Sequence, residues 1–193
     1  MSKRIIAIAG GIGSGKSVVS AILRLIGYVV YDCDSEAKLL MNTSVAIKND
    51  LITAFGSDSI TKEGYINTKY ISSIVFKDKS VLTKINSIVH PRVKEDILLK
   101  LKECEQDVMF VETAILMQSN LVDIISEAWV VTAPEDVRIE RVMKRNGMNR
   151  EDVMKRINAQ KGQDYTSLKY KEITNDGKKA ILPQIKSLLF DMY

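Results

Sequence analysis

The sequence predicts an α/β fold built on a parallel β-sheet, and three observations support this prediction. Short apolar segments that suit buried strands recur along the chain. These segments alternate with stretches of helical apolar spacing, as in a parallel sheet with helices packed on its faces. The first strand also runs directly through a glycine-rich loop into a helix. The 193 residues, 46% hydrophobic and 27% charged, suit one domain with an inserted subdomain.

The N-terminal segment carries the strongest local signal. The apolar strand Ile5–Ala9 is followed by Gly10–Ser17, which matches the pattern G-x-x-x-x-G-K-[ST] at every fixed position. A helix over Val18–Ile26 then ends at Gly27. In this context the loop N–H groups and the helix N-terminus can hold phosphate oxygens, whereas a mere glycine-rich turn would not need the whole motif. Lys16 can reach the terminal phosphates and the Ser17 hydroxyl can ligate magnesium.

The next part of the chain reads as one strand and a helical insertion. A second strand is predicted at Tyr28–Tyr31, followed by Asp32-Cys33-Asp34 and a helix from Glu36 to Met41. From Asn42 to about Leu101 the apolar periodicity is mostly helical and no strong strand is evident. Breaks in this helical region are expected at three positions: Gly56, Gly64 and Pro91.

The C-terminal half returns to the alternating pattern. Strands are predicted at Val108–Val111, Ala128–Thr132 and, more weakly, Lys171–Thr174. A basic helix should begin at Pro134 and end near Gly147, and Asn149 can cap the helix that follows. A turn at Asn175-Asp176-Gly177 precedes a closing helix, with Pro183 in its first turn or at a kink.

Candidate site residues follow from the rule that ligands bind at the carboxyl ends of parallel strands. The glycine-rich loop, Asp32–Asp34 and Glu112–Ala114 are therefore expected in one neighbourhood. Asp34 could accept the proton of an attacking hydroxyl, although a turn or cap role is the alternative. The basic helix could supply arginines from a closing lid, with Arg141 and Arg145 on one face, or it could simply be a solvated surface.

Several classes of protein are disfavoured by what the sequence lacks. It has no N-K-x-D guanine signature, no aspartate followed three residues later by glycine, and no second acidic metal motif, so a small-molecule kinase fits better than a GTPase or a motor ATPase. A net charge of +4 and 6% aromatic residues do not indicate a nucleic-acid partner.

The sequence also indicates the cellular location of the protein and the state of its cysteines. No apolar run reaches the roughly 20 residues of a membrane span, and Ser2-Lys3-Arg4 does not resemble a signal peptide. Cys33 and Cys104 suggest neither a metal knuckle nor a disulfide, so we expect a cytoplasmic protein with reduced thiols.

The lone histidine, His90, precedes Pro91. By itself this pair is typical of a helix-entry turn with a satisfied imidazole, and a substrate contact is the alternative.

Beyond these local patterns, the chain resembles the dephospho-CoA kinase family along nearly its whole length. Its phosphate loop is similar at every position, and Asp32-Cys33-Asp34 with Ala37 and Lys38 is similar to the family's D-A-D-x-x-A-R segment. Further similar segments are Phe55-Gly56, Glu63–Asn67, Val75-Phe76, Ile85–Pro91 (L-x-x-I-x-H-P), Arg156–Gln160 (R-I-x-A-Q) and Asn175–Gly177. The loop alone is common to many families, whereas the D-x-D, H-P and R-I-x-A-Q segments in this order are much more specific.

The resemblance implies a P-loop kinase fold and transfer of the ATP γ-phosphoryl group to the ribose 3′-hydroxyl of dephospho-CoA, with magnesium as cofactor. It implies a single domain over 1–193, with a core at about 1–33, 105–137 and 163–193, a helical substrate-binding insertion at about 34–104 and a lid at about 138–162. We expect a cytoplasmic protein, a monomer, with no nucleic-acid or membrane partner.

The resemblance also assigns roles to residues. The expected catalytic residues are Asp34 as base, Lys16, and Arg141 as the lid arginine that stabilises the phosphoryl group. The expected substrate contacts are Asp34, His90 and Glu112, and the metal ligand is Ser17. The expected ATP-binding residues are Gly11, Ile12, Gly13, Ser14, Gly15, Lys16, Ser17, Asn175 and Gly177.

The chain departs from the family pattern in two places. Ala114-Ile115-Leu116-Met117-Gln118 stands where the family commonly has P-L-L-F-E, which makes Glu112 the better candidate for a substrate or indirect magnesium contact. Val18 replaces a common threonine that is not needed as a metal ligand. Two other functions stay open at this point: another small-molecule kinase, and a regulatory nucleotide-binding module without transfer activity.

Overall fold

The computed structural model describes residues 3–78 and 80–192. The chain forms two compact units: the first combines Met1–Asp32 with Glu103–Tyr193, and the second is Cys33–Lys102. Within the described residues, none of the helices has the length and apolarity required to cross a bilayer.

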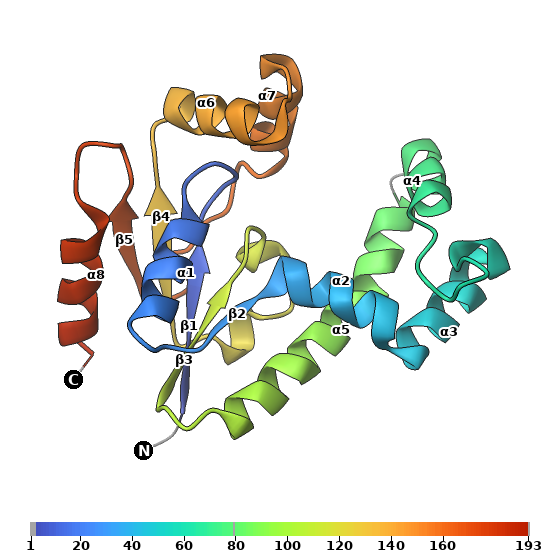
Figure 1. Ribbon diagram of the computed structural model, residues 1–193, viewed down its shortest axis with the longest axis horizontal. Coiled ribbons are helices and arrows are strands. Elements are labelled where there is room, and N and C mark those ends of the chain that lie inside the picture. Colours follow the sequence, from blue (N-terminus) through green and yellow to red (C-terminus); the bar gives the residue numbers. More distant parts are fainter. Residues whose placement is uncertain (1–2, 79, 193) are drawn as a thin grey trace. The chain divides into compact units, whose positions relative to one another are not determined.

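The first unit contains a parallel sheet of five strands, as the sequence predicts (Figure 1). The strands are β1 (Arg4–Ala9), β2 (Val30–Asp32), β3 (Val108–Glu112), β4 (Glu127–Thr132) and β5 (Tyr170–Thr174), in the spatial order β2-β3-β1-β4-β5. The central strand β1 therefore pairs with β3 on one side and β4 on the other. Its carboxyl end, where the glycine-rich loop begins, lies in the middle of the sheet.

Two helices pack on this sheet, α1 (Lys16–Leu25) and α8 (Ile181–Phe190). Pro183 lies in the first turn of α8, one of the two positions predicted for it. The shared core consists of Ile6, Ile8, Val19, Leu23, Val108, Phe110, Trp129, Val131, Ile173 and Ile185. Trp129 is fully buried, its ring centroid lies 5.0 Å from that of Phe110, and its indole N–H donates to Glu127 at 3.0 Å. The carboxylate thus satisfies the one polar group of the indole.

A second, smaller core lies between α6 (Glu135–Asn146) and α7 (Arg150–Ala159). The two helices are joined by Gly147, in the left-handed region at φ 65°, and by Asn149, which caps α7 by accepting from the Asp152 N–H. Both the break at Gly147 and the Asn149 cap were predicted. In Figure 1 the pair lies across the carboxyl end of the sheet, above the loop that follows β1.

The second unit is mainly helical. Its helices are α2 (Cys33–Thr43), α3 (Val45–Phe55), α4 (Thr68–Lys77) and α5 (Ser80–Glu103), with a short 3₁₀ turn, η1, at Ser57–Ser59. Gly56 ends α3 and Gly64 lies in a turn, as predicted. In the first unit, two further 3₁₀ turns, η2 (Leu116–Gln118) and η3 (Val122–Ile124), follow β3.

The predicted break at Pro91 is wrong, and so is the helix-entry turn at His90-Pro91, because α5 continues through both residues. A proline inside a helix removes the hydrogen bond to the carbonyl four residues earlier and costs about 3 kcal/mol or more. The helix buries a stripe at four-residue spacing, Ile85, Val89, Val93 and Ile97. Each fully buried aliphatic side chain contributes roughly 1.5–3 kcal/mol, so the stripe outweighs the proline penalty.

Candidate active site

The phosphate loop runs from the end of β1 to the first turn of α1. Gly10, Gly13 and Gly15 have φ values of 139°, 78° and 99°, which other residues adopt only under strain. Gly15 is the N-cap of α1, and no side chain caps the helix. The start of α1 therefore lacks a capping side-chain oxygen, and with the helix dipole it suits a bound phosphate.

Neighbouring elements approach the loop closely at Gly13 and Gly15. A Cβ at Gly13 would lie 2.6 Å from the Arg138 carbonyl oxygen, which is backbone of α6 and cannot move aside easily. A Cβ at Gly15 would lie 1.9 Å from Nδ2 of Asn175. The loop is thus fitted between the start of α6 and the segment after β5.

Lys16 and Ser17 occupy the first turn of α1. The Lys16 ammonium donates to the Gly10 carbonyl at 2.9 Å and so spans the two ends of the loop. The Ser17 side chain is exposed. The charge and the hydroxyl therefore stand where the motif predicts them, at the C-terminal end of the loop.

Arg141 and Asn175, which are predicted from separate segments, lie together beside the loop. The Arg141 guanidinium donates to the backbone carbonyl and to Oδ1 of Asn175, both at 3.1 Å. The Asn175 side-chain amide in turn donates to the Ser14 carbonyl at 2.8 Å. Gly177, with φ 82°, completes the turn after Asn175.

The apex of the loop is held by Arg138, from the predicted basic helix, and by Gln160, to which the sequence assigned no individual role. Arg138 Nε donates to the Ile12 carbonyl at 2.9 Å, and the Ile12 N–H donates to Oε1 of Gln160 at 2.7 Å. Burial lowers the pKa of Arg138 and the charge of Glu135 raises it, and the guanidinium remains a cation at neutral pH. The R-I-x-A-Q segment contained Gln160, but its contact with Ile12 spans 148 residues and has no local signal.

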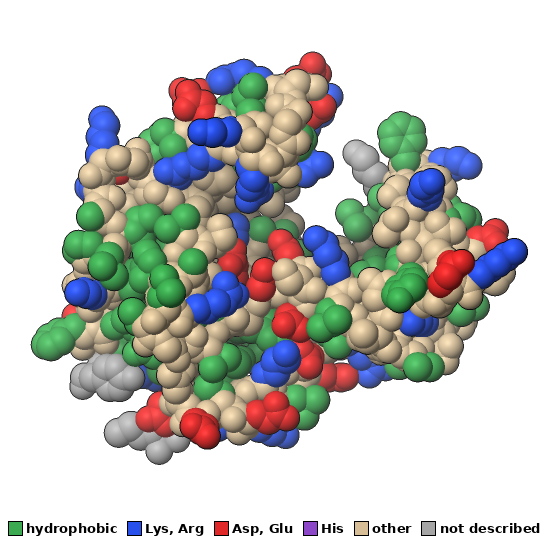
Figure 2. Space-filling view, viewed as in Figure 1, with side chains coloured by type: hydrophobic (Ala, Val, Ile, Leu, Met, Phe, Trp, Pro, Cys, Tyr) green, Lys and Arg blue, Asp and Glu red, His purple; other side chains and the backbone are tan. Residues whose placement is uncertain are grey.

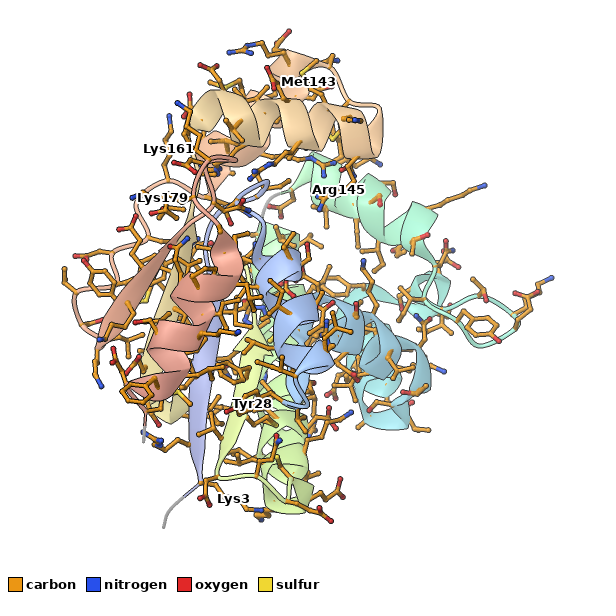
Figure 3. The ribbon with its side chains drawn as sticks, turned by 60° about the vertical axis from the view of Figure 1, so that its left-hand side comes forward. Lys3, Tyr28, Met143, Arg145, Lys161 and Lys179 are labelled. Carbon is orange, nitrogen blue, oxygen red and sulfur yellow. The ribbon has the colours of Figure 1, made fainter. Side chains whose placement is uncertain are left out.

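A cavity of about 260 Å³ adjoins the first glycines of the loop. Its polar walls include Thr132, Arg138, Gln160, Lys161 and Tyr165, and Figure 3 shows Lys161 near the helix pair that Met143 marks. Burial raises the pKa of Tyr165. The Tyr165 hydroxyl donates to Gln163, which donates to the Ala114 carbonyl at 2.8 Å, so the segment after α7 is tied to the segment after β3.

Two acidic residues lie side by side at the carboxyl edge of the sheet. Asp32 pairs in register with Glu112, and Glu112 with Ile8. Within the described residues no group of three or more His, Cys, Asp or Glu side chains could form a metal site. Ser17, the predicted magnesium ligand, lies in the first turn of α1, and its role as a ligand stays a prediction.

The remaining predicted residues, Asp34 and His90, belong to the second unit. Asp34 lies in the first turn of α2, which begins three residues earlier than the sequence suggested. His90 is half-buried in α5, and burial lowers the pKa of its imidazole. The structure therefore groups Lys16, Ser17, Arg141 and Asn175 around the loop, and their relation to Asp34 and His90 stays a prediction.

The outer surface of α6 and α7 carries mixed charge (Figure 2). Exposed ion pairs join Arg150 to Asp136 at 2.8 Å and Lys155 to Glu151 at 3.2 Å. Arg138 and Arg141 contact the loop, whereas Arg145 is exposed and donates to Asn146 at 2.9 Å. The action of this helix as a closing lid stays a prediction.

Comparison with known proteins identifies the family of the chain. A sequence model described as dephospho-CoA kinase matches residues 4–180. A dephospho-CoA kinase of Bacteroides fragilis is 35% identical over 191 residues, covering 97% of this chain and 92% of that protein. One of Porphyromonas gingivalis is 39% identical over 155 residues, covering 80% and 76%.

Solved structures share the fold. The crystal structure of TT1252 from Thermus thermophilus covers all of this chain and 97% of that one, with a TM-score of 0.80 and 28% identity. A dephospho-CoA kinase from Campylobacter jejuni covers 98% and 96%, with a TM-score of 0.67 and 19% identity. With a complete phosphate loop at the centre of a parallel sheet and a family match over most of its length, this chain belongs to the dephospho-CoA kinase family.

Proposed function

We propose that this chain transfers the γ-phosphoryl group of ATP to the ribose 3′-hydroxyl of dephospho-CoA, which gives coenzyme A and ADP. Membership of the dephospho-CoA kinase family is the observation that carries the proposal. The uncapped start of α1, with its glycine loop and Lys16, supplies a binding site for the triphosphate.

The residues of the loop have separable roles in this reaction. The N–H groups of the loop, apart from those of Ile12 and Ser14, which donate within the protein, bind the phosphate oxygens, and the Lys16 ammonium leaves the Gly10 carbonyl to neutralise the terminal phosphates. Magnesium, when held by Ser17 and the phosphates, offsets charge that develops on the transferred group. Arg141 adds a second positive charge from α6, and Asn175 with Gly177 borders the adenine.

Asp34 is the proposed general base. Its carboxylate takes the proton of the 3′-hydroxyl as that oxygen bonds to the γ-phosphorus and the bond to the β-phosphate oxygen breaks. The proposal rests on the family resemblance and on the position of Asp34 two residues after β2. Glu112, at the end of β3, and His90 are the proposed contacts with the acceptor.

The two additional segments are proposed to serve the same reaction. The helical insertion at about 34–104 would bind dephospho-CoA, and the lid at about 138–162 would exclude water from the transferring group. We also propose that the protein acts as a cytoplasmic monomer.

The function is tested by phosphorylation of dephospho-CoA with ATP and magnesium, followed as ADP release and as coenzyme A formed. Asp34→Asn keeps the side-chain size but removes the base, so kcat should fall about 100- to 10,000-fold while the Kd for ATP stays within about threefold. Asp50→Asn, a change at an exposed site in α3, is the matched control and should keep full activity.

Each negative result has a distinct meaning. Wild-type protein that phosphorylates nucleosides or sugars but not dephospho-CoA would contradict the proposed acceptor. Tight ATP binding without any phosphorylated acceptor would favour a regulatory nucleotide-binding module. An Asp34→Asn variant with normal turnover would remove Asp34 as the base but leave the reaction itself in place.

A further inference from the structure

Ile12, at the apex of the phosphate loop, is held at three points by the helix pair α6–α7. Its N–H donates to Gln160 at 2.7 Å, and its carbonyl accepts from Arg138 at 2.9 Å. Its side chain packs against the buried cluster of Ile139, Val142, Val153 and Ile157. The residue therefore belongs to the phosphate loop by sequence and to the core of the helix pair by packing.

These contacts give hydrogen-bond partners to the N–H and the carbonyl of Ile12, which are not bonded to other backbone groups of the loop. A hydrogen bond within the loop backbone runs from the Ser14 N–H to the Gly11 carbonyl at 3.1 Å, and it does not involve Ile12. A half-buried peptide N–H without a partner is unfavourable, so an acceptor for it stabilises the loop conformation in which it is found. Gln160, the C-cap of α7, is placed to supply that acceptor.

The approach of Arg138 reinforces the same arrangement. A Cβ at Gly11 would lie 2.3 Å from Nη2 of Arg138, so the guanidinium lies directly against the loop backbone. A Cβ at Gly13, on the other side of Ile12, would lie 2.6 Å from the backbone carbonyl oxygen of Arg138. The apex is thus enclosed by α6 on one side and by the end of α7 on the other.

We infer that Gln160 is a positioning residue, which fixes the apex of the phosphate loop through the Ile12 N–H and joins the loop to the helix pair as one body. Gln160 acts before ATP binds: the loop is already ordered, so less conformational entropy is lost when the phosphates arrive. The inference deepens the proposed function, on which it rests, and it predicts an effect on ATP binding rather than on the chemical step.

Two substitutions separate the hydrogen bond from the packing. Gln160→Met keeps the length of the side chain but removes the amide oxygen, whereas Gln160→Glu keeps an acceptor at the same reach. Asn158→Ala, at an exposed position of the same helix, is the matched control. Amide exchange of Ile12 in the ATP-free protein, followed by NMR, reads the hydrogen bond without any need for activity.

We expect Gln160→Met to speed exchange of the Ile12 amide about tenfold and to raise KM for ATP about tenfold, with kcat and KM for dephospho-CoA within about twofold. Gln160→Glu should restore slow exchange, although its negative charge beside the triphosphate raises KM for ATP. Asn158→Ala should match wild type in every measurement.

Three outcomes would overturn the inference. One is unchanged Ile12 exchange in Gln160→Met, and another is faster exchange throughout the protein with a lower Tm, which indicates a general structural role. The third is a fall in kcat with unchanged KM for ATP. Failure of the proposed function is distinguishable, because the exchange measurements stand even if wild-type protein does not phosphorylate dephospho-CoA.

A double-mutant cycle tests whether the contacts act through the same residue. Ile12→Ala removes the packing of the apex against the α6–α7 core and should itself raise KM for ATP. If Gln160 and Ile12 act together, the effect of Gln160→Met should be clearly smaller in the Ile12→Ala background than in wild type. Fully additive effects on KM would contradict the coupling.

Discussion

The C-terminal end of the phosphate loop and its apex owe their conformations to different kinds of contact. At the C-terminal end, Gly15, Lys16 and Ser17 are neighbours in sequence, and the start of α1 brings their N–H groups, charge and hydroxyl together, with Asn175 beside Gly15. At the apex, the backbone of Ile12 is held by hydrogen bonds with Arg138 and Gln160, which lie more than 120 residues away in the sequence. The comparison separates what a motif carries with it from what the rest of the fold must provide.

The C-terminal end and the apex also contribute differently to the proposed reaction. The C-terminal end supplies positive charge that interacts with the reacting phosphates, so its loss should affect both binding and turnover. The contacts at the apex fix the conformation of the loop. Their loss should therefore mainly raise KM for ATP or lower the free energy of unfolding. Each loop substitution below alters either the C-terminal end or the apex and leaves the other region unchanged.

The largest effect is expected from Lys16→Ala at the C-terminal end. Removal of the ammonium should lower kcat/KM for ATP by about 1,000-fold, through both parameters, because no other lysine of the motif replaces it. Steady-state kinetics with dephospho-CoA as acceptor measure this, and Lys186→Ala, an exposed site in α8, is the control. A loss no greater than that of Gln160→Met would contradict the proposed division between the two ends.

An intermediate effect is expected from Gly13→Ala at the apex. An alanine there meets a positive φ of 78° and the carbonyl oxygen of Arg138 at 2.6 Å, whereas at Gly147 it meets a φ of 65° with no atom within 4 Å. Gly147→Ala therefore reports backbone strain alone, about 1–2 kcal/mol. Gly13→Ala should lower the free energy of unfolding by about 1–3 kcal/mol more, since it adds overpacking against α6.

Urea denaturation of both alanine variants checks this difference. Equal loss of stability would mean that α6 yields to the added methyl group, and that the apex is not enclosed as tightly as the glycine contacts indicate.

The smallest effect is expected from Gly11→Ala. Its φ is not in the positive region, and the nearest atom to an added Cβ is the flexible end of Arg138. The free energy of unfolding should therefore change by less than about 0.5 kcal/mol. KM for ATP should still rise about threefold as the guanidinium loses its bond to Ile12, and isothermal titration of ATP would test the same shift directly. A stability loss as large as that of Gly13→Ala would contradict this ranking.

The parts of the fold predicted correctly are those with local causes. β1, the glycine loop, the Gly147 turn and the Asn149 cap each depend on residues within one or two turns of each other. The parallel sheet followed from the alternation of short apolar strands with amphipathic helices, which reflects burial rather than contacts between particular residues.

The parts that were missed depend on contacts distant in sequence. Pro91 was expected to end a helix because its local penalty is large, but buried residues on both sides of it maintain α5. Gln160 was noticed only as part of a family pattern, because nothing near it in the chain indicates a bond to Ile12. In the same way, Arg141 was predicted as a phosphate contact, whereas its bonds to Asn175 could not be foreseen.

The single tryptophan gives this protein a built-in optical label. Trp129 is fully buried beside Phe110 in the sheet, and the unit of residues 33–102 contains no tryptophan. Its fluorescence therefore follows the unfolding of the sheet-containing unit, whereas far-ultraviolet circular dichroism is sensitive to the helices of both units. If the two signals change at different urea concentrations, the helical unit unfolds as a separate cooperative body, and coincident curves show that the two units unfold together.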